Sequence, residues 1–138
     1  MYAVDASSRF HDRCARWLED ALNGTTRVGL PWPTLAAFLR IATHPKALDQ
    51  PLSSSEAIAY IDAWLDAPAG WVPLPTPNHR FVLASLVERY DLRADRIPDA
   101  HLAALAIEHG IAICSADSDF ARFSEVDWFN PLADAPRR

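Results

Sequence analysis

Residues 97–123 read IPDAHLAALAIEHGIAICSADSDFARF and contain the clearest structural signals of the chain. Pro98 suits the first turn of a helix, where its missing N–H costs nothing, and apolar residues then recur at helical spacing until Gly110, a typical helix C-cap. The unbroken apolar run 111–114 is too short for a helix and predicts a strand buried on both faces. A helix that leads into such a strand indicates a parallel α/β sheet.

Three aspartates flank this predicted helix and strand. Asp117 and Asp119 fall at the carboxyl end of the strand, where ligands collect in open α/β sheets, and Asp99 in the first helical turn can approach the same edge. Each also has an ordinary role as a helix or turn cap. Together they outline a site for a hard cation, and an all-carboxylate site suits Mg²⁺ or Mn²⁺ better than zinc.

The rest of the chain alternates predicted helices with predicted strands. Ser53 and Glu56 have the spacing of a capping box, and Thr76 followed by Pro77 has the chemistry of a helix start. The predicted helices are 10–22, 33–43, 53–67, 76–90 and 98–109, and the predicted strands are 27–30, 71–74, 111–114 and 126–129, with a charged loop at 93–96. This alternation predicts an α/β fold with a parallel sheet between helices.

The composition is that of a globular protein. A chain of 138 residues fits one domain, which we expect over residues 1–132 with a flexible tail at 133–138. The sequence shows no apolar run long enough to cross a bilayer, and no leader in which a basic segment is followed by an apolar one. Both observations predict a cytoplasmic protein without membrane contact. The formal charge of −5 counts against a generic nucleic-acid binder, although bound cations would offset a carboxylate cluster.

Several motifs taken together resemble one family. PDAHLAALAIEHG is followed by a strand, by S-x-D-x-D-F-x-R-F and by NPL at 130–132, while GLPW at 29–32 and FLR at 38–40 stand upstream. In order and spacing this resembles the PIN-domain ribonucleases, most closely the VapC-type toxins of bacterial toxin–antitoxin pairs in their mycobacterial form. The resemblance implies a three-layer α/β/α PIN-like domain whose short parallel sheet is flanked by helices.

The resemblance also implies a function. It is that of a metal-dependent endoribonuclease toxin, which hydrolyses phosphodiester bonds of tRNA or rRNA and inhibits translation with Mg²⁺ or Mn²⁺ as cofactor. The implied partners are the RNA, a small antitoxin protein and a second copy of the chain in a homodimer. Arg40 and Thr43 are candidates for contacting the RNA or ordering the site, although Arg40 could equally stabilise the end of its helix.

The site residues carry over position by position. Asp99 aligns with the acid that opens the family's DAHLAALA helix, and Asp117 and Asp119 align with the acids of its T-x-D-x-D-F motif. These three are therefore implied to be the catalytic, cation-holding residues. Ser115 takes the threonine position of that motif and keeps a hydroxyl.

Two departures from the family pattern bear on activity. The family's first acid belongs to a D-x-N-x-L motif that would lie just upstream of residues 1–3, so we expect the first strand to be shortened or missing, with Asp5 as a substitute ligand. Many relatives also carry a glutamate where this chain has Ala37. The alternative is therefore a catalytically weak or inactive PIN-fold module that binds an antitoxin or another protein.

Overall fold

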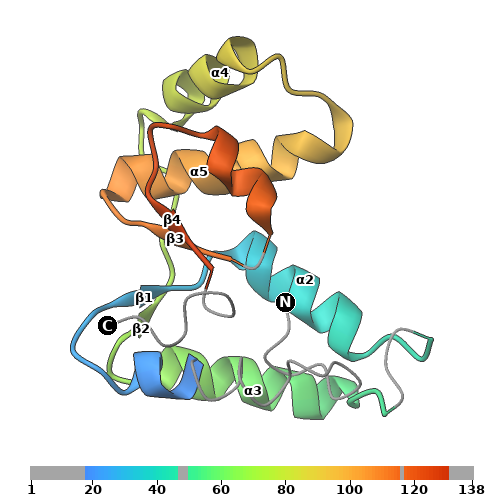
Figure 1. Ribbon diagram of the computed structural model, residues 1–138. Helices are drawn as coiled ribbons and strands as arrows, with labels where there is room; N and C mark the ends of the chain where they lie inside the picture. Colours follow the sequence, from blue (N-terminus) through green and yellow to red (C-terminus); the bar gives the residue numbers. More distant parts are fainter. Residues whose placement is uncertain (1–17, 47–49, 116, 131–138) are drawn as a thin grey trace. The chain divides into compact units, whose positions relative to one another are not determined.

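The computed structural model describes residues 18–46, 50–115 and 117–130 (Figure 1). The chain divides into two compact units, an N-terminal unit ending at Val72 and a C-terminal unit beginning at Pro73. After helical residues 18–22, the N-terminal unit contains β1 (Val28–Gly29), α2 (Trp32–Ala42), α3 (Ser54–Asp66) and β2 (Gly70–Trp71). The C-terminal unit contains α4 (His79–Arg89), the 3₁₀ helix η1 (Ala94–Arg96), α5 (Ile97–His109), β3 (Ile113–Cys114), the 3₁₀ helix η2 (Ser118–Arg122) and β4 (Trp128–Phe129).

In the N-terminal unit, β1 and β2 form a parallel pair with Val28 opposite Gly70. The predicted capping box at the start of α3 is confirmed, because the Ser53 hydroxyl accepts from the Glu56 amide and the Glu56 carboxylate accepts from the Ser53 amide. Residue 70 must be glycine, since a Cβ there would lie 2.1 Å from the Trp64 carbonyl oxygen. The buried side chains of α2 and α3 are those of Leu35, Phe38, Ala42, Ala57 and Ile61.

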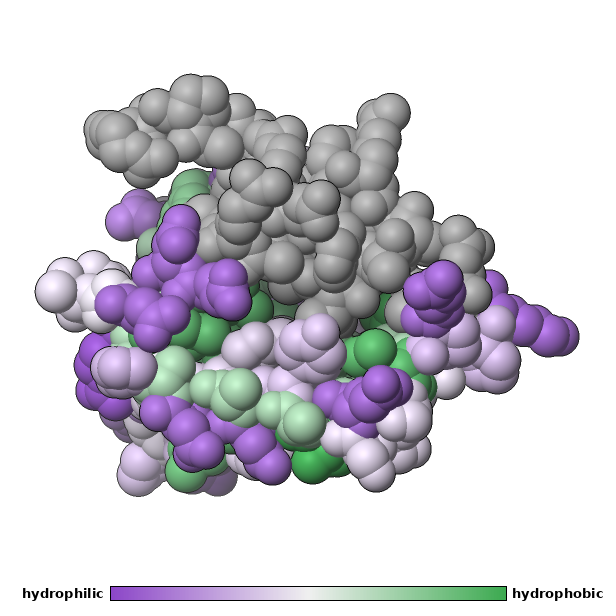
Figure 2. Space-filling view, turned by 90° about the horizontal axis from the view of Figure 1, so that it is seen from below, coloured by the Kyte–Doolittle hydropathy of each residue, from purple (hydrophilic) through white to green (hydrophobic). Residues whose placement is uncertain are grey.

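Among the coloured residues of Figure 2, hydrophilic and hydrophobic residues lie side by side rather than in separate patches. On α3, Ile58 and Tyr60 both have exposed apolar side chains. Single exposed apolar residues are normal on a protein surface, and their exposure alone identifies no site.

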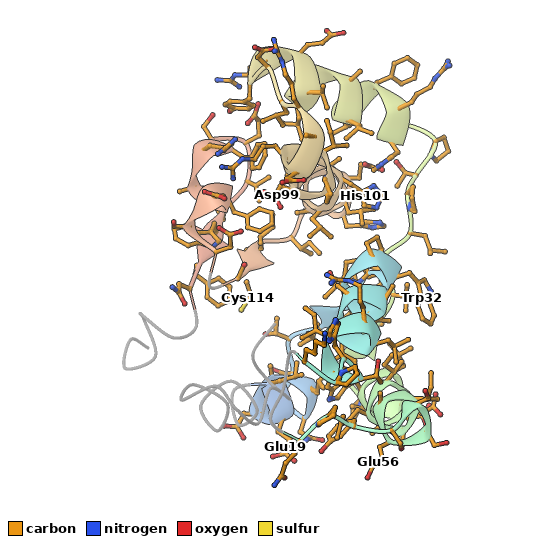
Figure 3. The ribbon with its side chains drawn as sticks, turned by 90° about the vertical axis from the view of Figure 1, so that its right-hand side faces the viewer. Glu19, Trp32, Glu56, Asp99, His101 and Cys114 are labelled. Carbon is orange, nitrogen blue, oxygen red and sulfur yellow. The ribbon has the colours of Figure 1, made fainter. Side chains whose placement is uncertain are left out.

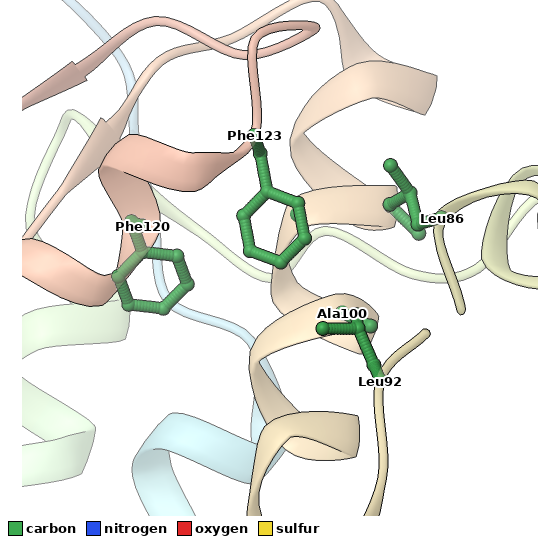
Figure 4. Packing of buried hydrophobic residues seen from close by; sticks show 7 residues of the cluster. Leu86, Leu92, Ala100, Phe120 and Phe123 are labelled. Atoms are coloured by element: carbon green, nitrogen blue, oxygen red, sulfur yellow. The ribbon is translucent and has the colours of Figure 1, made fainter. Parts of the chain in front are cut away.

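In the C-terminal unit, α5 packs against α4 through a side of small residues. Ala100, Ala103 and Ala104 of α5 are fully buried, and their small side chains allow the neighbouring elements to approach closely. Phe120 and Phe123 come from and just after η2 and complete this core with Leu86 and Leu92 (Figure 4). The core therefore anchors η2 beside α5.

The transition from α5 to β3 follows the predicted pattern. Gly110 ends the helix with φ of 65°, the left-handed conformation that glycine adopts without steric cost. β3 then pairs in parallel with β4, with Ile113 opposite Trp128. The predicted α/β class, with short parallel strands and flanking helices, is confirmed.

Several local predictions were wrong, and each of the predicted strands is longer than the two-residue strand that the structure shows. The run 111–114 is not buried on both faces, since Ile111 and Cys114 are exposed; in the described residues β3 has only β4 beside it, and such a pair covers little of either strand face. α4 begins at His79 rather than at Thr76, whose hydroxyl donates to Glu108 and accepts from the Asn78 amide in the turn before the helix. The expected loop at 93–96 contains the 3₁₀ helix η1.

Other predictions fall outside the described residues. These are the start of the first predicted helix, Asp5 with the expected first strand, and the tail at 133–138. No helix in the part of the chain that the structure describes is both long enough and apolar enough to cross a membrane.

Candidate metal centre

Three carboxylates from three consecutive elements meet in the C-terminal unit. Asp99 lies in the first turn of α5, Asp117 follows β3, and Asp119 lies in η2. One carboxylate oxygen from each lies within 4.8 Å of the other two. Within the described ranges this is the one group of three or more histidine, cysteine, aspartate or glutamate side chains with metal-ligand spacing.

Side-chain hydrogen bonds to the backbone fix the turn that carries two of these aspartates. The Asp117 carboxylate accepts a 2.9 Å hydrogen bond from the Asp119 amide and so caps η2. The Ser115 hydroxyl accepts from the Asp117 amide at 3.0 Å, and the Ser115 carbonyl accepts from the indole N–H of Trp128 at 3.0 Å. Buried Phe120 holds η2 in the core. These contacts order the backbone at Ser115, Asp117 and Asp119.

The electrostatics of the cluster favour a cation. Burial raises the pKa of Asp99, and the negative charges of Asp117 and Asp119 raise it further, while Arg96 and Arg122 act in the opposite direction. Like charges held this close disfavour one another's ionised form, and a bound cation would remove that cost.

Two arginines contact the cluster through Asp119. Nη1 of Arg96 forms a hydrogen-bonded ion pair with Oδ2 of Asp119, and Nη2 of Arg122 lies 4.0 Å from Oδ1. The hydrogen bond to Asp119 and the negative charge of that carboxylate raise the pKa of Arg96. Sequence reasoning gave neither arginine a role, and the position of Arg96 just before the helix of Asp99 was the available signal.

The donor set fits a hard divalent cation. All three side chains offer carboxylate oxygen, the ligand that Mg²⁺ and Mn²⁺ prefer, and none offers the nitrogen or sulfur typical of structural zinc. Asp99 and Asp119 are partly buried, whereas Asp117 is exposed to solvent.

The other predicted site residues lie elsewhere. Arg40 is exposed in the last turn of α2, in the N-terminal unit, and Thr43 donates its hydroxyl hydrogen to the Leu39 carbonyl at 2.6 Å. The C-terminal unit alone therefore assembles the three carboxylates. Asp5 lies outside the described residues.

A second polar cluster was missed by sequence reasoning. The Glu108 carboxylate accepts from the amide and hydroxyl of Thr76 and, at 2.5 Å, from Nδ1 of His79. Nε2 of His79 lies 3.1 Å from Nδ1 of His101. Asp99 and His101 are two positions apart and so lie on opposite sides of α5 (Figure 3), which separates this cluster from the carboxylates.

This chain matches one domain family and several known proteins. The PIN domain profile matches residues 1–126. Ribonuclease VapC37 of Mycobacterium tuberculosis is 43% identical over 133 residues, which cover 96% of this chain and 92% of that protein. Ribonuclease VapC33 of the same species is 39% identical over 132 residues, which cover 96% and 92%.

A solved structure has a similar fold. It is the crystal structure of VapBC2 from Rickettsia felis bound to a DNA fragment from their promoter, which matches with a TM-score of 0.63 over 94% of this chain and 90% of that chain. The sequence identity is 16%, so this likeness concerns the fold alone.

Proposed function

Because the chain belongs to the PIN-domain family, and within it to the VapC ribonucleases as its sequence predicted, we propose that it is a metal-dependent endoribonuclease toxin. The observation that carries this proposal is the convergence of Asp99, Asp117 and Asp119, the residues that match the family's acidic motifs. We propose that the domain extends over residues 1–132. It acts in the cytoplasm on RNA and inhibits translation by cleaving tRNA or rRNA.

Different residues of the chain have different roles in the proposed reaction. Asp99, Asp117 and Asp119 would hold Mg²⁺ or Mn²⁺, which supplies positive charge beside the scissile phosphate and promotes attack of water at phosphorus. The Asp117 carboxylate also accepts from the Asp119 amide, which orders the Asp119 backbone. Ser115 orders the backbone of Asp117. Arg40 and Thr43 of the N-terminal unit are proposed to contact the RNA.

The proposed partners are a small antitoxin and a second copy of the chain. The similarity of fold to VapBC2 supports an antitoxin, which we propose lays an apolar helix on the toxin and places an arginine against the carboxylates. Phe81 and Leu74, exposed by 60% and 59%, are apolar surface that a partner could cover. Light scattering at micromolar concentration tests the homodimer, and a lone monomer would contradict it.

The decisive experiment for the catalytic site is Asp117→Asn. The asparagine side chain keeps an oxygen for the Asp119 amide, so the fold should persist while one cation ligand is lost. We expect Mn²⁺-dependent RNA cleavage to fall by more than about 100-fold, because even outer partners of metal ligands are worth about 10- to 100-fold. Asp127→Asn is the matched control, since Asp127 is an exposed aspartate in the same unit.

Calorimetry separates this proposal from the inactive-module alternative. The wild-type protein should take up Mn²⁺ with measurable heat, and Asp117→Asn should take up much less. Equal cleavage by wild type and Asp117→Asn would refute the site. Absence of any Mn²⁺ heat in the wild type would favour the module that only binds an antitoxin or partner protein.

A further inference from the structure

Arg96 lies next to the carboxylate cluster and pairs with one of its members, Asp119. It is the last residue of η1 and directly precedes α5, three positions before Asp99. Its ion pair with Asp119 joins residues 23 positions apart, and the two side chains remain 43% and 39% exposed. The pair is thus built from separate elements and is open to solvent.

In the ion pair, Arg96 offsets the negative charge of Asp119, which a bound metal ion would otherwise offset. Three aspartates gather here, and both guanidinium groups near them act on Asp119, with Arg96 bonded to Oδ2 and Arg122 4.0 Å from Oδ1. Other arginine pairs in the described part of this unit, Arg89 with Glu125 for example, leave the cluster's carboxylates untouched. Arg96 is therefore the direct competitor of a cation for Asp119.

A cation on the carboxylates would change what Arg96 can bind. The guanidinium and a divalent cation would repel each other. The cation would also attract the Asp119 carboxylate and so weaken its ion pair with Arg96. Arg96 is not part of the buried core, so it can leave Asp119 without disturbing the packing. A guanidinium matches phosphate oxygens with two parallel hydrogen bonds, and hydrolysis requires an RNA phosphate beside this cluster.

We propose that Arg96 exchanges partners, pairing with Asp119 in the cation-free protein and binding an RNA backbone phosphate once a divalent cation occupies the carboxylates. This inference rests on the proposed function. If the proposal is right, Arg96 weakens cation binding and strengthens RNA binding, so one side chain has effects of opposite sign on the two affinities. Replacing a residue that only supports the fold would instead weaken both cation binding and RNA binding.

The test compares Arg96→Gln with Arg93→Gln. Arg93 lies in the same loop but pairs with Asp91, and both of those side chains are 78% exposed. Calorimetric titration with Mn²⁺ alone should show Arg96→Gln binding about 2- to 5-fold more tightly than wild type, the size of a partly exposed ion pair. Arg93→Gln should stay within about 2-fold of wild type.

The second measurement uses a short single-stranded 2′-O-methyl RNA in saturating Mn²⁺, with gel electrophoresis to verify that it stays intact. Arg96→Gln should bind this probe about 10-fold more weakly, as expected for a lost charged hydrogen bond. The slope of log K against log salt should become shallower by about 0.7, the value for one phosphate contact to a single strand. Arg96→Lys keeps the charge, and it should preserve the slope.

The outcomes separate the two proposals. If the wild type binds no Mn²⁺, the proposed function fails. If the wild type binds Mn²⁺ but Arg96→Gln binds it no more tightly, or keeps the wild-type salt slope for RNA, the exchange of partners is refuted while the metal centre stands. A loss of both affinities would make Arg96 a structural residue.

Discussion

Glu108 is a buried carboxylate that is kept charged by its hydrogen bonds. Its side chain is only 2% exposed, and burial alone would favour the neutral form. Hydrogen bonds from the amide and hydroxyl of Thr76 and from His79 outweigh burial and lower its pKa. His101, on the far side of His79, has a lowered pKa because of burial and the charge of His79. Glu108 and His101, which lie on either side of His79, therefore both resist protonation.

We predict that the protein loses stability as the pH falls below about 6.5. Because the pKa of His101 is lower in the folded chain than the ordinary 6.5, the unfolded chain binds the proton first, and stability falls from there through the folded pKa. Glu108 adds a second loss below its ordinary 4.5. Melting temperature as a function of pH measures both.

His101→Asn removes the first of these losses. The amide of asparagine can donate to or accept from Nε2 of His79, so the hydrogen bond can persist while the titrating group is gone. The melting temperature of this variant should change less than that of wild type near pH 6.5. His44→Asn, at an exposed position in the N-terminal unit, is the control. The same pH dependence in His101→Asn and wild type would contradict the assignment.

At the scale of elements, predictions held where the signal was local. Pro98 and Gly110 bracket α5 nearly as the sequence predicts, and the capping box of Ser53 and Glu56 forms as expected. The predicted start of α4 at Thr76 was wrong. The Thr76 hydroxyl binds a carboxylate 32 positions away, and no local sequence pattern reveals such a contact.

The same distinction applies to the candidate site. The aspartates could be placed near one another because they bracket one helix and one strand in a short stretch. The pairing of Arg96 with Asp119 depends on how η1 and η2 pack, so it could not be predicted from spacing. The strand lengths were mispredicted for a similar reason, because a strand's length depends on how many of its residues pair with the neighbouring strand, here two in each case.

The small-residue side of α5 gives a prediction for packing. Ala103 is fully buried, so Ala103→Leu must force extra volume into a filled core and should destabilise the protein by about 1–3 kcal/mol. Urea unfolding monitored by circular dichroism measures the change. Ala84→Leu makes the same substitution at an exposed position of α4 and should stay within about 0.5 kcal/mol of wild type. Equal effects at both positions would show that Ala103 is not tightly packed.

At the scale of the whole molecule, the chain carries a formal charge of −5 and gathers three acids in one place. We predict that Mn²⁺ at about 100 times its Kd stabilises the folded protein by about 2.7 kcal/mol, because it binds the assembled site and not the unfolded chain. The rise in melting temperature on adding Mn²⁺, and its reversal by a chelator, measure this. Asp117→Asn should lose most of the rise, and retention of the full rise would place the ion elsewhere.

The position of the carboxylates along the chain also has a kinetic consequence. Arg96 and Asp119 close a loop of 23 positions, and closing so short a loop costs little chain entropy. Contacts of this kind form early, before those that join distant segments. We therefore expect the acids to be neighbours already in the transition state for folding. A cation that binds them there would speed refolding in stopped-flow experiments, rather than acting only by slowing the unfolding of the finished protein.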